Sequence, residues 1–426
     1  MSNKQRNRRP LNWSRLDNAA KIFPPTSHGA DSGVFRLSCE LTEPVEPELL
    51  QKALEKTVVQ FPHMRMVLRR GGFWYYLEQS TLEPRVVPEH APPCAPLYHG
   101  SHALLFEVSW WRGKVNLDVF HVLSDGSGAI AFFQALLAAY LALRHPEEAA
   151  APAPGASVYA RTEDGFAKYY QPHGGRYGGQ RRAYHLRGAR QGDGGLNILE
   201  GVADVEQVLA AAHRCGATLT AYLCAALIRA IREEMRSRDL SRPVVLTVPV
   251  DLRSYFPSDT ARNFFGTIRV TYDFRERSGD FADIVAAVSE TFRSQLTAER
   301  LAERMNALSA LEHNPLLRPI PLVLKNPILR LSGDVAAWGE TATLSNIGRF
   351  RLPEAAAPYV KGFSAFMATH CTQLCTCTFG KSFHMGFTSV LLSPEVQRRF
   401  FRLLTEDGID LEIRSNGFYA EETEEA

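Results

Sequence analysis

The sequence lacks several features that mark other classes of protein. Its 426 residues carry 48 basic and 46 acidic side chains, so the formal net charge of +2 does not point to nucleic acid or another acidic partner. The most apolar stretch, residues 128–143, contains Gln134 and is shorter than the ~20 residues that a transmembrane helix needs. The basic N-terminus has no apolar run behind it. We therefore expect a cytoplasmic protein without a transmembrane segment.

Cysteine is also scarce. The seven cysteines are an odd number scattered over a long chain, which argues against a disulfide framework and for a reducing compartment. Cys371, Cys375 and Cys377 lie close together, but they lack the C-x-x-C spacing of a zinc knuckle, and CTCTF alternates like a strand. We therefore favour buried strand cysteines over a zinc site.

Three catalytic signatures are missing from the sequence. It has no H-E-x-x-H metal motif and no G-x-G-x-x-G nucleotide fingerprint. SDGSG around Ser127 does not have the G-x-S-x-G order of a serine hydrolase. We therefore expect no metal and no permanently bound cofactor.

The most informative stretch that is present runs over residues 115–143. Residues 115–122 alternate as a strand does, and the residues after Gly126 form an apolar run of helical length. His121, Asp125 and Gly126 lie in the polar turn between them. A glycine that allows a tight turn from strand to helix provides a rigid mount for one imidazole. This arrangement suits a general base.

The motif His121-x-x-x-Asp125-Gly126 in this context resembles the active-site motif of the acyltransferase superfamily that includes chloramphenicol acetyltransferase and peptide-synthetase condensation domains. Alcohol acetyltransferases and wax ester synthases are the members that the chain resembles most. The resemblance implies an α/β fold of two similar layered halves, with a tunnel at their interface and the histidine midway along it. Many members have another histidine where this chain has Phe120.

The second half carries two further signals in the order that the superfamily has. Arg253 ends the segment PVDLR, and Asn263 begins the segment NFFG before the next strand. The resemblance implies that Asp125 pairs with Arg253 as structural support rather than acting in catalysis. We therefore predict an N-terminal half over residues 1–180 and a C-terminal half over residues 181–426, joined through a glycine-rich crossover at 159–195.

Alternation of helical and strand patterns predicts a layered α/β fold rather than a helix bundle. We expect strands at residues 34–41, 103–110, 115–122, 244–250, 268–274, 342–344, 371–379 and 383–390. We expect helices at residues 47–59, 126–143, 205–215, 220–235, 281–311, 316–331 and 394–404. A hairpin is predicted around Gly71 and Gly72.

Two groups of basic residues have a functional and a structural interpretation. Arg65 lies where condensation-type enzymes often have an arginine, but no catalytic partner adjoins it, so we favour a structural role. Arg176, Arg181 and Arg182 in GGRYGGQRR could contact phosphate. A solvated loop is the simpler interpretation, because no strand and helix flank the segment to form a phosphate cradle.

The resulting hypothesis is an acyltransferase that uses acyl-CoA as donor and a small alcohol, or failing that an amine, as acceptor. Neutral His121 would act as general base without a covalent enzyme intermediate. Candidates for oxyanion or tunnel contacts are the Gly126 N–H, Asn263, and Ser345 and Asn346 in a predicted polar turn that resembles the Ser-Asn turn of wax ester synthases. Two alternatives stay open: a condensation-like enzyme with a carrier-protein donor, and a degenerate, non-catalytic binding protein. Monomer or oligomer, acyl length and acceptor are not specified.

Overall fold

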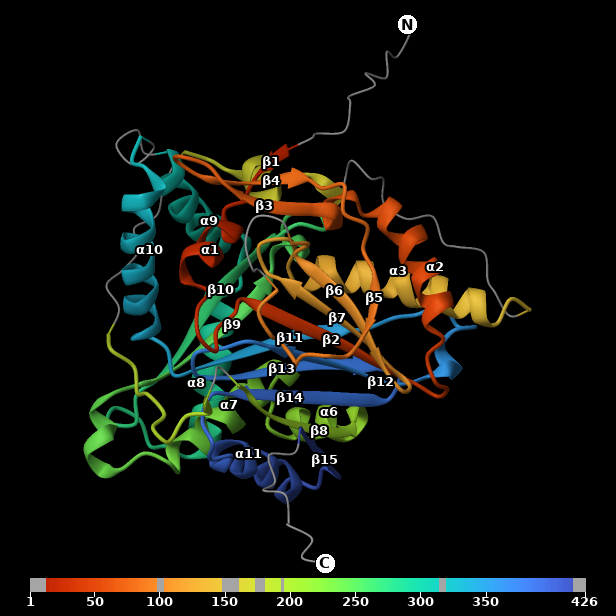
Figure 1. The fold of residues 1–426 in the computed structure, drawn as a ribbon. Coiled ribbons are helices and arrows are strands. Elements are labelled where there is room, and N and C mark those ends of the chain that lie inside the picture. Colours follow the sequence, from red (N-terminus) through yellow and green to blue (C-terminus); the bar gives the residue numbers. More distant parts are fainter. Residues whose placement is uncertain are drawn as a thin grey trace, which may run out of the picture.

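The computed structural model describes residues 13–97, 103–147, 161–172, 181–192, 195–313 and 319–416, in a mixed α/β fold (Figure 1). The strands in chain order are β1 Trp13–Arg15, β2 Val34–Leu41, β3 Met66–Arg70, β4 Tyr75–Gln79, β5 Val86–Pro88, β6 Phe106–Trp111, β7 Lys114–Phe120, β8 Asn197–Asp204, β9 Val244–Asp251, β10 Phe265–Tyr272, β11 Ala342–Arg349, β12 Val360–Met367, β13 Thr372–Phe379, β14 Ser382–Ser389 and β15 Glu412–Ser415. The α-helices are α1 Phe23–Thr26, α2 Pro47–Gln60, α3 Gly126–Arg144, α5 Gly165–Tyr169, α6 Val205–Arg214, α7 Leu219–Arg232, α8 Phe281–Gln295, α9 Ala298–His313, α10 Leu322–Ala337 and α11 Glu395–Glu406.

The described strands form three sheets. A seven-stranded sheet has the order β10-β9-β11-β13-β14-β8-β15, and a five-stranded sheet has the order β12-β2-β7-β6-β5. A small sheet, β1-β4-β3, contains the predicted hairpin of β3 and β4. Each large sheet has its own apolar core, one built mainly from residues before position 145 and the other mainly from residues after position 195.

The two large sheets are not built from separate halves of the chain. Strand β12, which comes late in the sequence, pairs antiparallel with β2 at the edge of the five-stranded sheet. Phe363 on β12 also packs 5.9 Å from Phe133 on α3, between ring centroids. A division at residues 180 and 181 therefore stays a prediction about the course of the chain, and the segment 173–180 that precedes it lies outside the described residues.

Helix α3 follows the turn that carries His121, and it is the most apolar part of the chain. Phe132 packs edge-to-face on Phe61 at the end of α2 and on Phe106 of β6, so α3 packs against both α2 and the five-stranded sheet. By length and composition α3 could span a membrane, as could the bent pair α6 and α7. The packing of α3 in the core accounts for its apolar character.

Most predicted elements of the two cores are present, but the region from residue 281 to 349 differs from the prediction. Three helices, α8, α9 and α10, replace the two that we expected, because the chain breaks near Leu296. Helix α10 also lies later in the chain than the predicted helix at 316–331 and contains Pro327. The predicted polar turn Ser345–Gly348 was wrong: these residues continue β11 in parallel pairing with β13. The turn-like composition reflects an irregularity between Asn346 and Gly348, where Gly348 adopts a φ of +87°.

The cysteine and arginine predictions have simple structural outcomes. Cys375 and Cys377 are buried in β13, a strand covered on both faces, whereas Cys371 precedes this strand and is only half-buried. No group of His, Cys, Asp or Glu among the described residues could hold a metal. Arg181 pairs with Asp273 at 3.2 Å, and Arg182 lies over the Trp338 ring at 5.6 Å. Arg176 lies outside the described residues, and Arg65 ends a 3₁₀ turn before β3.

Candidate active site

His121 is the first residue after β7. Its backbone N–H donates to the carbonyl of Gly33 at 2.9 Å, which extends the pairing of β7 with β2 by one residue. This bond fixes the backbone from which the His121 side chain projects. The chain then turns sharply into α3. Only 8% of the His121 surface is exposed, so the imidazole is held inside the protein.

Aromatic rings enclose the His121 imidazole. Phe23 of α1 stacks on it, with 4.5 Å between centroids and an interplanar angle of 14°. Phe35 of β2 and Phe265 of β10 approach at 5.1 and 5.2 Å. This burial lowers the pKa of His121 from its usual value, because an imidazolium is poorly solvated among apolar rings. The ring is therefore neutral at pH 7 and able to accept a proton.

A hydrogen-bonded chain determines which nitrogen of His121 accepts that proton. His121 Nδ1 lies 2.9 Å from Asn263 Oδ1, and Asn263 Nδ2 donates to Asp17 Oδ2 at 3.3 Å. An ionised carboxylate only accepts, so Asp17 orients the Asn263 amide with its nitrogen toward Asp17 and its oxygen toward His121. Nδ1 must then carry the hydrogen. The lone pair of the neutral ring is on Nε2.

Asp17 was not among the residues singled out from the sequence. It is 1% exposed, accepts from the Ala20 N–H at 2.8 Å, and lies 3.6 Å from a guanidinium nitrogen of Arg262. Burial raises the pKa of Asp17 to about 6, although Arg262 opposes the shift. At pH 7 the carboxylate is therefore mostly ionised, as its role as acceptor requires. No motif surrounds Asp17, so only its position in space reveals it.

Asp125 joins the two parts of the site. Its carboxylate accepts two hydrogen bonds from Arg253, at 2.9 and 3.1 Å, and one from the Phe264 N–H at 2.7 Å. It also caps α3 by accepting from the Gly128 N–H at 2.9 Å. Asp125 therefore links the motif turn to the segment that carries Asn263.

The motif turn and the segment that carries Asn263 make further contacts with each other. Ser127 Oγ donates to Asp251 at 2.8 Å, and Ser124 Oγ donates to the Ala261 carbonyl at 2.6 Å. A Cβ at Gly128 would lie 2.0 Å from the Ala261 carbonyl oxygen, so only glycine fits there. The second glycine of DGSG is thus a packing requirement that the sequence pattern alone did not reveal.

The predicted oxyanion candidates are placed differently from one another. The Gly126 N–H belongs to the first turn of α3, where backbone donors have no partner within the helix. Asn346 lies on β11, where its side chain donates to Thr220 Oγ1 at 2.9 Å and accepts from the Gly348 N–H at 3.0 Å. Ser345 precedes it on the same strand. The structure therefore brings His121, Asn263, Asp125 and Arg253 into one bonded network, whereas Asn346 is engaged with α7 and its own strand.

Comparison with known proteins supplies the context of this site. A sequence profile of the C-terminus of phthiocerol/phthiodiolone dimycocerosyl transferase matches residues 202–360, which is less than half of the chain. A search of curated protein sequences found no relative.

Solved structures resemble the whole chain. Polyketide synthase associated protein 5 from Mycobacterium tuberculosis has a TM-score of 0.60 at 13% identity, covering 92% of this chain and 96% of that one. The first condensation domain of the CDA synthetase has a TM-score of 0.61 at 17% identity, covering 94% and 98%. The chain has the condensation-domain fold. TRI101 of F. sporotrichioides, solved with coenzyme A and T-2, has a TM-score of 0.64 at 15% identity, covering 95% and 100%. The predicted likeness to the condensation-domain and chloramphenicol acetyltransferase-like superfamily is thereby confirmed at the level of the fold.

Proposed function

We propose that this condensation-domain-like chain transfers an acyl group from a coenzyme A thioester to a hydroxyl, with His121 as general base. The observation that supports the proposal best is the state of the His121 ring. It is buried, its pKa is lowered, and its Nδ1 is bonded to Asn263, so Nε2 carries the lone pair. A neutral imidazole held in one tautomer is suited to general base catalysis.

The reaction is balanced without a covalent enzyme intermediate. The acceptor oxygen attacks the thioester carbonyl carbon while His121 Nε2 takes the hydroxyl proton. The tetrahedral intermediate then collapses, the carbon–sulfur bond breaks, and the Nε2 proton passes to the departing thiolate. The products are an ester and free coenzyme A. The aromatic rings around His121 exclude water, which disfavours hydrolysis of the thioester.

The negative charge on the intermediate needs a hydrogen-bond donor. The Gly126 N–H is the best candidate, because it adjoins Asp125 in the motif turn and lies at the positive end of the α3 dipole. Asn263 is a poorer candidate, since both ends of its amide are bonded to His121 and Asp17. Asn346 would have to release Thr220 and Gly348 first.

The donor could instead be held on a carrier protein, as condensation domains of peptide synthetases resemble this chain. TRI101, another protein of this fold, was solved with coenzyme A, which favours the free thioester. A non-catalytic binding protein is the rival from a different class. It is disfavoured because such a protein has no need of an oriented, neutral His121.

We expect the purified chain to release coenzyme A from acyl-CoA only when an acceptor is present, because the base needs a hydroxyl to deprotonate. A mass-spectrometric screen of acyl-CoAs against alcohols, sugars and lipids would identify the ester. Initial rates should then give intersecting lines, as for a ternary complex. Parallel lines with an isolable acyl-enzyme would contradict direct transfer, and turnover of carrier-bound acyl groups alone would support the carrier-dependent alternative.

Asn263 and Asp17 should act as positioning residues for His121. We expect Asn263→Ala to lower kcat by roughly 10²-fold with little change in KM, because the wrong tautomer of a base is unreactive. Asp17→Asn should have a smaller effect, about tenfold, since Asn263 loses only the group that orients it. Nitrogen NMR of the His121 ring should show Nε2 protonation rising in both variants.

The matched control for these variants is Asn197→Ala. Its side chain donates to the Leu391 and Leu392 carbonyls, away from His121, so the variant removes a carboxamide without touching the ring. Equal losses of kcat in the control, or an unchanged tautomer in Asn263→Ala, would show that the His121–Asn263–Asp17 chain does not set the protonation of the ring.

A further inference from the structure

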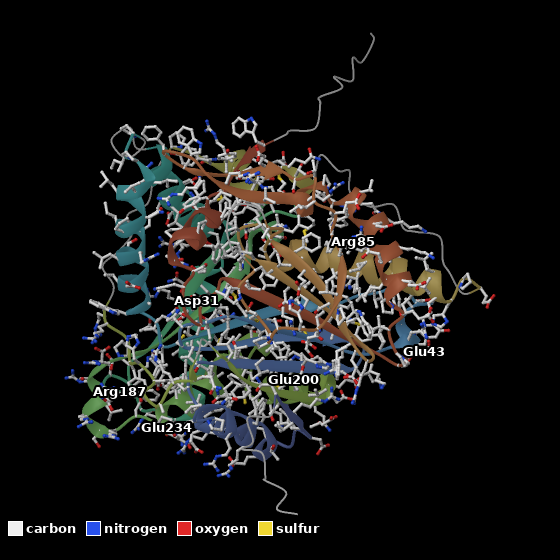
Figure 2. All side chains as sticks on the ribbon, in the orientation of Figure 1. Asp31, Glu43, Arg85, Arg187, Glu200 and Glu234 are labelled. Atoms are coloured by element: carbon white, nitrogen blue, oxygen red, sulfur yellow. The ribbon has the colours of Figure 1, made fainter. Side chains whose placement is uncertain are left out.

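Helix α10 presents an apolar stripe to solvent. Val323, Leu324, Ile328, Leu331, Val335 and Trp338 are 49 to 67% exposed, and from Leu324 onward they recur every three or four residues, on one face. We call these six residues the α10 stripe. Figure 1 shows α10 at the outer edge of the molecule beside α1, and Figure 2 shows side chains of this helix on its outer side as well as toward the body.

Apart from the buried Leu322 in its first turn, α10 makes several polar contacts with the body while its apolar stripe faces outward, which reverses the usual pattern of a surface helix. Asn326 donates to the Tyr75 hydroxyl at 2.8 Å, Lys325 to the Phe73 carbonyl at 3.1 Å, and Arg330 to the Pro25 carbonyl at 3.1 Å. Gly333 packs so closely on Thr26 that a Cβ there would lie 2.9 Å from its methyl carbon. The helix is thus held in a defined orientation with its apolar face outward.

The apolar surface continues beyond the helix. The β3–β4 loop adjoins the first turn of α10, because the Leu322 N–H donates to the Gly72 carbonyl at 2.9 Å. Phe73 and Trp74 of this loop are 44% and 52% exposed. Helix α10 has 16 residues and is about 24 Å long. The combined apolar area of the helix and the loop is therefore larger than the area of the isolated apolar residues on an ordinary protein surface. Such a surface marks an interaction site.

Charge and shape indicate the partner. A surface pocket of about 390 Å³ beside the stripe is lined by Arg70 and Arg330, with Asp334 as its one carboxylate, and by Val323 and Leu331 of the stripe. A third cation, Arg182, lies over Trp338 at the far end. Apolar and aromatic side chains flanked by arginines are typical of helices that lie in the interface of an anionic bilayer. Because α10 lies at the outer edge of the molecule, the stripe can also lie against a flat surface.

We propose that the α10 stripe docks this protein on an anionic lipid bilayer. The docking surface is connected to the site described above. Pro25 and Thr26 of α1 contact α10, and Phe23 of the same short helix stacks on His121. If the proposed function holds, an amphiphilic acceptor or acyl donor in the bilayer would thus meet the enzyme on the side where Phe23 covers one face of the imidazole. Docking itself does not depend on acyl transfer.

Flotation of the purified chain with vesicles tests the proposal. We expect binding to vesicles of phosphatidylcholine and phosphatidylglycerol in equal parts, weaker binding to phosphatidylcholine alone, and release by salt. The double variant I328S/L331S should bind the vesicles roughly tenfold or more weakly, because two apolar side chains no longer enter the bilayer. Val59→Ser is the matched control, since Val59 is a 72% exposed apolar residue on α2. Circular dichroism should show that all variants are folded.

The emission of Trp338, obtained as the difference from Trp338→Phe, should shift to the blue on binding. His121→Ala should bind vesicles like the native chain, so that failure of docking and failure of the catalytic assignment give different results. Equal binding of I328S/L331S and the native chain, or no binding to anionic vesicles, would overturn the proposal. So would a dimer that I328S/L331S dissociates, which would make the stripe an interface between copies of the chain.

Discussion

His121→Ala should lose roughly 10²–10⁴ of kcat for acyl transfer while the variant remains folded, because the site then has no base to take the acceptor proton. Binding of the acyl donor should change little, since His121 acts on the hydroxyl and not on the thioester. Stopped assays that measure both free coenzyme A and ester would give kcat, and calorimetry with a non-hydrolysable acyl-CoA analogue would give donor affinity. His90→Ala removes an exposed histidine and serves as control.

The pH profile gives a second readout of the same assignment. Burial among Phe23, Phe35 and Phe265 lowers the pKa of His121, so the neutral ring persists at a pH where an ordinary histidine would be protonated. The acidic limb of kcat/KM should therefore lie below pH 6.5. Full activity of a folded His121→Ala variant, or an acidic limb well above pH 6.5, would require a different base.

The sequence predicted the parts of the site that depend on local chemistry. A strand, a tight turn and an apolar helix around His121 follow from alternation and length, and β7 and α3 lie where these patterns indicate. Likewise β9 ends just before Arg253, and β10 begins two residues after Asn263. Such local signals suffice because each element carries its own burial pattern.

Features that depend on contacts between residues far apart in the sequence were not predicted. Nothing near Asp17 in the sequence indicates that it lies behind Asn263, 246 positions away. Strand β12 was missed because its pairing with β2 decides its structure. The helix predicted at residues 316–331 corresponds to α10, which runs instead from Leu322 to Ala337 with Pro327 inside it. The pattern of α10 was also uninformative about burial, since an apolar stripe ordinarily faces the core.

Disrupting the Asp125–Arg253 pair should have the largest effect on stability. Arg253 is 14% exposed and Asp125 5% exposed at their side chains, so either charge without its partner is poorly solvated. We expect Arg253→Ala to lower the free energy of unfolding by roughly 3–5 kcal/mol. The variant also leaves the Thr260 and Arg262 carbonyls without their guanidinium donor.

Asp125→Asn should cost less than Arg253→Ala, because the remaining Arg253 still has Asp251 at 2.9 Å. The asparagine can also still cap α3 at Gly128 through its carbonyl oxygen. What it loses is the second acceptor, which the carboxylate uses for the Phe264 N–H and Arg253 together. Urea unfolding followed by tryptophan fluorescence would measure both single variants.

The double variant tests whether Asp125 and Arg253 act together to link the motif turn to the segment that carries Asn263. Its loss should be smaller than the sum of the single losses by roughly 1–3 kcal/mol, because the second substitution removes a group that the first had already left unpaired. The exposed pair of Arg300 and Glu303 is the matched control, for which a coupling of only about 0–1 kcal/mol is expected. Strict additivity at Asp125 and Arg253 would mean that the pair does not contribute to stability as a unit. If the two substitutions are coupled and Asp125→Asn stays folded but loses kcat, the Asp125–Arg253 pair also sets the position of His121.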